Sequence, residues 1–267
     1  MKQTLCTIIS NVQVMPGTYL MWIEAPDIAT AAQPGQFITV RCPDLTLRRP
    51  FSVHQVSQDK VAILFKIVGK GTLWLSRQRS GDKLDIFGPL GNGFNVQPQS
   101  RKLLLTAGGI GIAPLIFLTQ RVPSHCVVTL IHGANTAAQI YPDAYQPPAV
   151  NHREIRFIAV TEDGSLGQKG LAIDILRDYL DWADQVYACG PVDMYKALAD
   201  TSLRIPTKSG QGKLKLKKCQ ISLEVRMGCG LGACYGCTID TKKGLKRVCR
   251  DGPVFELDDI IWQEVHI

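Results

Sequence analysis

The chain has 267 residues, of which 45% are hydrophobic, and a formal net charge of +7. This length allows two domains and a small third unit, and the sequence holds no apolar run of the roughly 18 residues that a membrane-spanning helix needs. Five lysines fall within residues 208–218, with Gly210 and Gly212 between them. Such a run is typical of a solvated linker, so the charge does not predict nucleic-acid binding. Because the amino-terminal residues lack the features of a secretory signal, we expect a cytoplasmic protein without membrane insertion.

Residues 1–97 predict an antiparallel β-barrel. Short segments of strand composition alternate with turns at Pro16-Gly17, Pro34-Gly35 and residues 80–82, a pattern typical of small barrels. The expected strands are Thr4–Ile9, Tyr19–Ile23, Gln36–Arg41, Phe51–Gln55, Val61–Ile67 and Lys83–Ile86. One helix or turn is expected between Gly69 and Arg79.

Residues 98–207 predict a doubly wound α/β domain with a parallel sheet, because strand and helix patterns alternate there. The expected strands are Leu103–Thr106, Val127–His132, Ile155–Val160 and Gln185–Ala188, and the expected helices run through Gln120, over Ala172–Asp181 and over Asp193–Ser202. The lysine-rich stretch then separates a third unit, residues 212–267. This unit is too small for a large core of its own, and a metal cluster would supply the missing cross-links.

Four cysteines near the carboxyl end predict the metal centre of this third unit. Cys229, Cys234 and Cys237 follow the spacing C-x4-C-x2-C, and Cys249 comes after eleven further residues. This is the first part of the plant-type spacing for a [2Fe-2S] cluster held by four thiolates. Four thiolates can also hold zinc, which would make the chain a zinc-stabilised binding module. A zinc-stabilised binding module would not explain the glycine-rich loops of the other two domains.

The barrel contains two segments that suit a phosphorylated, flat ligand. In Arg49-Pro50-Phe51-Ser52 the arginine can clamp a phosphate, the aromatic ring can stack on a flat ring, and the serine can bond a ring heteroatom. The segment also fits an ordinary edge strand. Further along, a second segment offers glycines, a hydroxyl and free amides at the start of a helix, where they can bind a pyrophosphate. The residues of this second segment are Lys66, Ile67, Val68, Gly71 and Thr72.

Two loops of the α/β domain follow a strand and precede a helix, at the sheet edge where ligands bind in open α/β folds. The first contains Gly108, Gly109 and Gly111; it suits a dinucleotide pyrophosphate but does not match G-x-G-x-x-G, and it also fits a packing turn. The second is Cys189-Gly190-Pro191. Taken alone, its cysteine fits an ordinary buried thiol better than a binding residue.

Taken in order, and with Gly88-Pro89-Leu90-Gly91 between them, these motifs resemble the ferredoxin–NADP reductase superfamily over about residues 1–205. The resemblance implies an FAD-binding barrel followed by a pyridine-nucleotide domain. It assigns FAD contacts to Arg49, Pro50, Phe51 and Ser52, and Phe51 stands where tyrosine is usual. It assigns the nicotinamide nucleotide to Gly108, Gly109, Gly111, Cys189, Gly190 and Pro191.

The short gap between Cys237 and Cys249 narrows the resemblance to the electron-transfer subunits of class B dihydroorotate dehydrogenase. The stretches 48–52, 161–165 and 229–237 are also similar to that family. The resemblance implies a subunit of a heteromeric oxidoreductase in pyrimidine biosynthesis. Electrons from the FMN centre of a catalytic subunit, which oxidises dihydroorotate to orotate, would pass through [2Fe-2S] and FAD to NAD+.

The same resemblance implies a heterotetramer with two copies of each subunit and no dihydroorotate site in this chain. It favours NAD over NADP as the nucleotide. Related layouts serve as diaphorase subunits of cytosolic hydrogenases and of bifurcating ferredoxin–NAD(P) oxidoreductases, which remain the alternative at this point.

Overall fold

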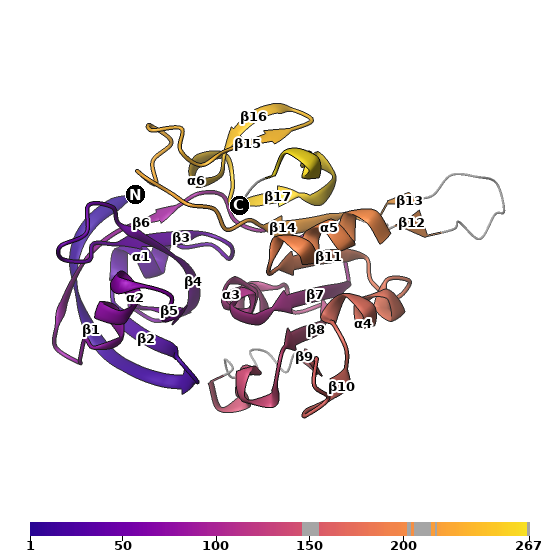
Figure 1. Cartoon of the computed structure of the whole chain (residues 1–267), viewed down its shortest axis with the longest axis horizontal. Helices are drawn as coiled ribbons and strands as arrows, with labels where there is room; N and C mark the ends of the chain where they lie inside the picture. Colours follow the sequence, from indigo (N-terminus) through magenta and orange to yellow (C-terminus); the bar gives the residue numbers. More distant parts are fainter. Residues whose placement is uncertain (146–154, 202–203, 206–214, 217, 266–267) are drawn as a thin grey trace.

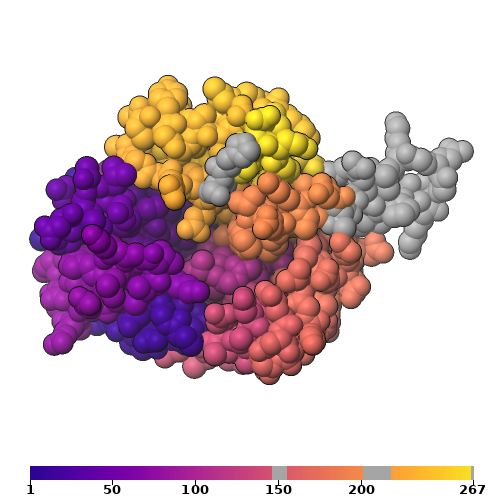
Figure 2. All heavy atoms as spheres, viewed as in Figure 1, coloured from indigo at the N-terminus to yellow at the C-terminus, as the bar shows by residue number. Residues whose placement is uncertain are grey.

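The computed structural model describes residues 1–145, 155–201, 204–205, 215–216 and 218–265. A β-barrel, an α/β domain and a carboxyl-terminal unit lie against one another (Figure 1). In the space-filling view the carboxyl-terminal unit, in yellow, rests on both the barrel and the α/β domain (Figure 2). Among the described residues, the helices are all too short or too polar to cross a membrane.

The amino-terminal domain is a closed barrel whose strands follow the order β1-β2-β5-β4-β3-β6, each neighbour antiparallel. The strands are β1 (Lys2–Met15), β2 (Thr18–Glu24), β3 (Phe37–Val40), β4 (Arg49–Ser57), β5 (Lys60–Lys66) and β6 (Lys83–Leu90). Two helices accompany them, α1 (Pro26–Ala31) and α2 (Lys70–Ser76). The expected barrel and its helix after Gly69 are confirmed. Sequence patterns missed α1, whose six residues are too few to show a helical period.

The α/β domain has parallel strands with helices on both faces, as expected. Its strands are β7 (Lys102–Gly108), β8 (Val127–Ala134), β9 (Ile155–Thr161), β10 (Gln168–Lys169) and β11 (Gln185–Cys189), and its helices are α3 (Ile112–Arg121), α4 (Ala172–Tyr179) and α5 (Val192–Thr201). Short 3-10 turns lie at η1 (Gly109–Gly111), η2 (Ala137–Gln139) and η3 (Asp143–Tyr145). Along β7, alternate leucines face opposite sides: Leu105 packs with α3 and Leu104 packs with α4 and α5.

The carboxyl-terminal unit does not form a separate layer. Its elements are β14 (Cys219–Ser222), β15 (Thr238–Thr241), β16 (Gly244–Arg247), α6 (Val248–Asp251), β17 (Val254–Glu256), η4 (Leu257–Asp259) and η5 (Trp262–Glu264). Strand β14 pairs in parallel with β11, and β17 pairs antiparallel with β14, so the sheet order is β10-β9-β8-β7-β11-β14-β17. The strands β12 (Arg204–Ile205) and β13 (Lys215–Leu216) form a small antiparallel pair. Most of the expected lysine-rich linker, residues 208–214 and 217, lies outside the described residues.

One hydrophobic core joins the three units. It contains Phe37 and Leu90 of the barrel, Leu104 and Tyr195 of the α/β domain, and residues of the carboxyl-terminal unit. The last group includes Cys219, Ile221, Cys237, Ile239, Val248, Cys249, Leu257 and Trp262. Burial of this apolar surface favours one fixed arrangement of the units.

The barrel also meets the carboxyl-terminal unit through its backbone. The Asn92 amide donates to the Gly252 carbonyl at 2.5 Å, and Asn92 forms an isolated bridge with Pro253. Gly91 has φ +73, and a Cβ there would lie 2.6 Å from both the Gly252 carbonyl oxygen and the Pro253 ring. Only glycine allows the two segments to approach this closely.

We therefore expect Gly91→Ala to destabilise the chain far more than Gly17→Ala. Gly17 has a similar φ of +66 but open space around its Cα, so it serves as the matched control. The control should lose about 1 kcal/mol from the left-handed backbone alone, and Gly91→Ala a further 1–3 kcal/mol, roughly, from overpacking. Denaturant unfolding of both variants measures the difference. Equal midpoints would show that the barrel does not pack against residues 252–253 as described.

Candidate functional site

The four expected cluster cysteines lie together in the carboxyl-terminal unit. Cys229 and Cys234 belong to the loop after β14, Cys237 precedes β15, and Cys249 lies on α6. The Cys237 and Cys249 sulfur atoms are 3.2 Å apart and buried, whereas Cys234 is exposed at the protein surface. Gly228 and Gly236 both lie beside the Cys234 sulfur. A Cβ built on Gly228 would be 3.1 Å from this sulfur, and one built on Gly236 would be 3.6 Å from it.

Backbone amides point at three of these sulfurs. The Cys229 sulfur accepts hydrogen bonds from the amides of Leu231 (3.3 Å) and Cys234 (3.4 Å). The Cys249 sulfur accepts one from Gly232 (3.1 Å), and the Cys237 sulfur accepts one from Cys249 (3.4 Å). Amide donors of this kind stabilise thiolate charge and tune the potential of a bound cluster.

The electrostatics of the loop also favour thiolate ligands. Burial raises the pKa of the Cys229 thiol, but the amides of Leu231 and Cys234 outweigh burial and lower the pKa to about 6. Metal ligation requires the thiolate form. Among the described residues, no three His, Cys, Asp or Glu side chains converge closely enough to hold one metal ion. A [2Fe-2S] cluster is held by four thiolates shared between two irons, so each iron needs only two of them. The close pair of sulfurs from Cys237 and Cys249 suits one such iron.

The two loops of the α/β domain that were expected to bind a nucleotide lie against each other. They are neighbours because β7 and β11 pair in parallel and end at the same edge. A Cβ at Gly108 would lie 2.7 Å from the Pro191 ring, and one at Gly111 would lie 2.1 Å from the Cys189 carbonyl oxygen. The glycines thus allow the two loops to pack closely, because a side chain at Gly108 or Gly111 would clash with the facing loop. Gly109, with φ +52, has open space around its Cα.

A buried tyrosine joins the Cys189–Pro191 loop to the carboxyl-terminal unit. The Gly190 amide donates to the Tyr195 hydroxyl at 2.9 Å, and that hydroxyl donates to the Ser222 carbonyl at 2.7 Å. The Tyr195 ring stacks on Trp262, with centroids 5.7 Å apart. Burial raises the pKa of the neighbouring Cys189 to about 12, so its sulfur remains a thiol at neutral pH.

In the barrel, Arg49 lies beside the start of α2. Gly71 permits this approach, because its Cβ would lie 3.2 Å from Arg49 Cγ and Nε. Arg48 forms an ion pair with Asp85 at 2.8 Å, whereas Arg49 pairs with no carboxylate among the described side chains and donates to the Leu47 carbonyl. An unpaired guanidinium next to the free amides of a helix start suits a phosphate.

The other residues of the two barrel segments have divided roles. Phe51 is 9% exposed and packs on Phe65 in the barrel core, so its ring does not lie on the face of β4 that carries Pro50 and Ser52. The Thr72 hydroxyl accepts from the amides of Val68 (2.9 Å) and Gly69 (3.2 Å), which holds the loop before α2. Lys66 and Val68 are exposed, and Ile67 is half-buried.

Sequence reasoning missed a buried polar network between the barrel and the α/β domain. His54 of β4 donates from Nδ1 to the Ala113 carbonyl (2.9 Å), and its Nε2 lies 2.8 Å from the Tyr141 hydroxyl. His132 donates from Nε2 to the Gly109 carbonyl (3.0 Å) and accepts the Tyr141 amide at Nδ1 (3.2 Å). Both histidines are neutral, because burial lowers each pKa to about 4. The network fixes β4 relative to the glycine-rich loop.

Family models match the two later units. Residues 224–261 match the iron-sulfur cluster binding domain of dihydroorotate dehydrogenase B, and residues 105–200 match an oxidoreductase NAD-binding domain. A dihydroorotate dehydrogenase B (NAD(+)) electron transfer subunit of Desulforamulus reducens is 40% identical, over 96% of this chain and 97% of the relative. One of Caldanaerobacter subterraneus subsp. tengcongensis is 35% identical, over 96% of this chain and 97% of the relative. This chain belongs to the family of dihydroorotate dehydrogenase B electron transfer subunits.

Solved structures of other oxidoreductases have a similar fold. An NADH-dependent reduced ferredoxin-NADP oxidoreductase superposes with a TM-score of 0.82 and 27% identity, over 97% of this chain and 91% of that chain. A ferredoxin NADP+ reductase from Neisseria gonorrhoeae has a TM-score of 0.67 and 17% identity, over 83% of this chain and 98% of that chain. At 17% identity, the similarity to the Neisseria gonorrhoeae enzyme concerns the fold alone.

We expect serine at position 229, 234, 237 or 249 to remove most of the bound iron, because each change deletes one thiolate ligand. Cys126→Ser is the matched control. Cys126 is also buried but lies far from the loop in the sequence and bonds the Ser100 carbonyl. Iron and sulfide analysis after anaerobic purification measures the effect. Full iron content in a Cys249→Ser protein would contradict the assigned ligand set.

We expect the unfolding free energy to fall as the pH drops from about 6.5 toward 4. His54 and His132 resist protonation in the folded chain and accept protons below about 6.5 once unfolded, so acid favours unfolding. The loss should reach roughly 1 kcal/mol per histidine at about pH 5.5. Urea unfolding at about pH 7.5 and 5.5 measures it. His54→Gln should show a smaller loss between the two pH values, and an unchanged loss would refute the assignment of His54.

Proposed function

We propose that this chain carries electrons from the FMN centre of a dihydroorotate dehydrogenase catalytic subunit to NAD+, using a [2Fe-2S] cluster and FAD. The observation that carries the proposal is the cysteine loop, whose amides point at its sulfurs and whose unit shares a sheet with the α/β domain. FAD exchanges hydride with nicotinamide and single electrons with a cluster. It therefore has to bind between the two, on the barrel.

Each ligand has residues in the chain that suit it. Arg49 and the amides that begin α2 would hold the FAD pyrophosphate, and Pro50 and Ser52 would contact its ring system. The nicotinamide nucleotide would lie on Gly108, Gly109, Gly111, Cys189, Gly190 and Pro191. The cluster would be held by Cys229, Cys234, Cys237 and Cys249. The ligand-binding units are accordingly residues 1–97 for FAD, 98–207 for NAD and 212–267 for the cluster.

The proposal includes a partner. The names of the relatives describe an electron transfer subunit, which requires a catalytic subunit. We propose that the partner contains FMN, that two copies of each chain form a heterotetramer, and that the complex works in the cytoplasm. A diaphorase role in a bifurcating oxidoreductase is the second candidate, and the structural likeness to such an enzyme supports it. The 40% identity to the dihydroorotate dehydrogenase B subunit favours the first.

The test compares the chain alone with the chain plus the FMN subunit. Alone, it should bind FAD, contain iron and sulfide, and reduce ferricyanide with NADH, but it should not oxidise dihydroorotate. With the FMN subunit, dihydroorotate should reduce NAD+. Cys249→Ser should abolish this coupled reaction and retain NADH–ferricyanide activity, because only the coupled reaction needs the cluster. Coupling that survives in Cys249→Ser, or dihydroorotate oxidation by the chain alone, would refute the proposal.

A further inference from the structure

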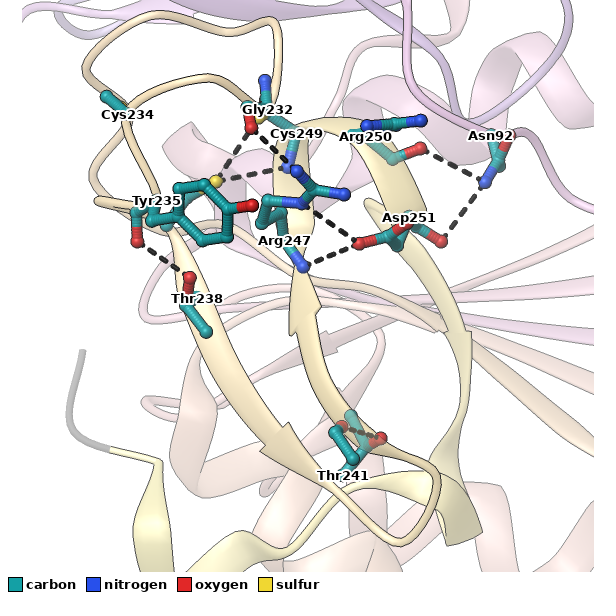
Figure 3. A network of polar contacts seen from close by, with 12 residues as sticks. Asn92, Gly232, Cys234, Tyr235, Thr238, Thr241, Arg247, Cys249, Arg250 and Asp251 are labelled. Carbon is teal, nitrogen blue, oxygen red and sulfur yellow. Dashed lines mark hydrogen bonds and ion pairs between the residues drawn. The ribbon is translucent and has the colours of Figure 1, made fainter.

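One arginine contacts the cysteine loop at two places. Arg247 ends β16 and stands two residues before Cys249. Its Nη1 donates to the Gly232 carbonyl at 2.8 Å, between Cys229 and Cys234. Its guanidinium also lies over the Tyr235 ring, 4.9 Å from the centroid, between Cys234 and Cys237. Figure 3 shows the guanidinium between these two residues and Asp251.

Gly232 is held from three sides. Its amide donates to the Cys249 sulfur at 3.1 Å, and its carbonyl accepts from Arg247. Its φ is +80, and the Arg250 side chain lies where a Cβ would be, with Cδ at 2.8 Å. The Gly232 amide and carbonyl flank the same Cα, so the Arg247 contact on the carbonyl and the Cys249 contact on the amide together restrict φ and ψ at Gly232. The Arg247 contact therefore limits the directions in which the Gly232 amide can point.

Arg247 is itself fixed to the barrel. Asp251 accepts the Arg247 backbone amide at 2.8 Å, and its carboxylate lies 3.6 Å from Arg247 Nε. The side-chain amide of Asn92 donates to the carbonyls of Arg250 (3.3 Å) and Asp251 (3.1 Å). A continuous set of contacts therefore runs from the cysteine loop through Arg247 and Asp251 to the loop that follows β6 (Figure 3).

We propose that Arg247 is a positioning residue for the iron–sulfur site, which orients the Gly232 amide toward Cys249 and so raises the reduction potential of the cluster. Amide bonds to cluster sulfurs stabilise the reduced form, which carries one more negative charge. The planar guanidinium is needed because it bonds a carbonyl and stacks on a ring at once, which an ammonium group does less well. This inference rests on the proposed function, because it requires the cluster.

The experiment is a redox titration of the protein loaded with FAD and cluster, in which dithionite supplies one electron to each cluster. The electron paramagnetic resonance signal of the reduced cluster reports the potential, and the flavin absorbance serves as an internal reference. Arg247→Gln and Arg247→Lys should both shift the cluster potential to more negative values and leave the flavin potential unchanged. Lysine keeps the charge, so a shift in Arg247→Lys isolates the geometric contribution.

Lys246→Gln is the matched control, because it removes the same charge one residue earlier, on the opposite face of β16. Its cluster potential should equal that of the unmodified protein. If Arg247→Gln has an unchanged potential, or if Arg247→Lys restores the original value fully, the positioning role is refuted.

If the Arg247 variants lose their iron, their cluster potential has no readout, and Asp251→Asn then tests the proposal. This variant keeps the shape of the side chain and weakens its hold on Arg247, so the potential should shift in the same direction by a smaller amount. An unchanged potential there would refute the proposal. Absence of a cluster signal in the unmodified protein would instead refute the proposed function.

Discussion

The parallel pairing of β14 with β11 is the constraint on which the arrangement of the molecule depends. It places the end of β14 beside Cys189 and Gly190, so that Tyr195 can bridge the Gly190 amide and the Ser222 carbonyl. Strand β17 then pairs with β14 and carries Gly252 and Pro253 onto the barrel loop at Asn92. The cysteine loop is thus placed by the sheet of the α/β domain and not by the chain that links the units.

Much of this molecule follows from local patterns in the sequence. The barrel strands, the parallel strands of the α/β domain and the helix after Gly69 lie where they were predicted, because hydrophobic alternation and turn residues act locally. The largest difference is in β1, which continues to Met15, six residues beyond the predicted end at Ile9. The cysteines lie together because their spacing already confines them to one loop and the start of α6. The Gly108 and Cys189 loops meet because parallel neighbours end at one edge.

The remaining features depend on contacts between distant parts of the chain. The motif at Arg49–Ser52 does not show that the position of Phe51 in the pleat places its ring with Val53 in the barrel core. His54 and Tyr141 are 87 positions apart and show no motif, although a lone buried histidine in a strand is a weak signal for such a network. Arg247 looks like any surface arginine in the sequence. Only the fold of the hairpin shows that it reaches Gly232 and Tyr235.

The shared sheet also limits how this protein can be dissected. A fragment that ends before β14 would leave β11 as an uncovered edge strand with unpaired backbone groups, which favours association with other chains. It would also expose the side of Tyr195 that packs on Trp262. The carboxyl-terminal residues alone would retain a two-stranded hairpin and the strands β14 and β17 without their supporting sheet. Dividing the chain at the lysine-rich stretch would therefore not give two independently folded domains.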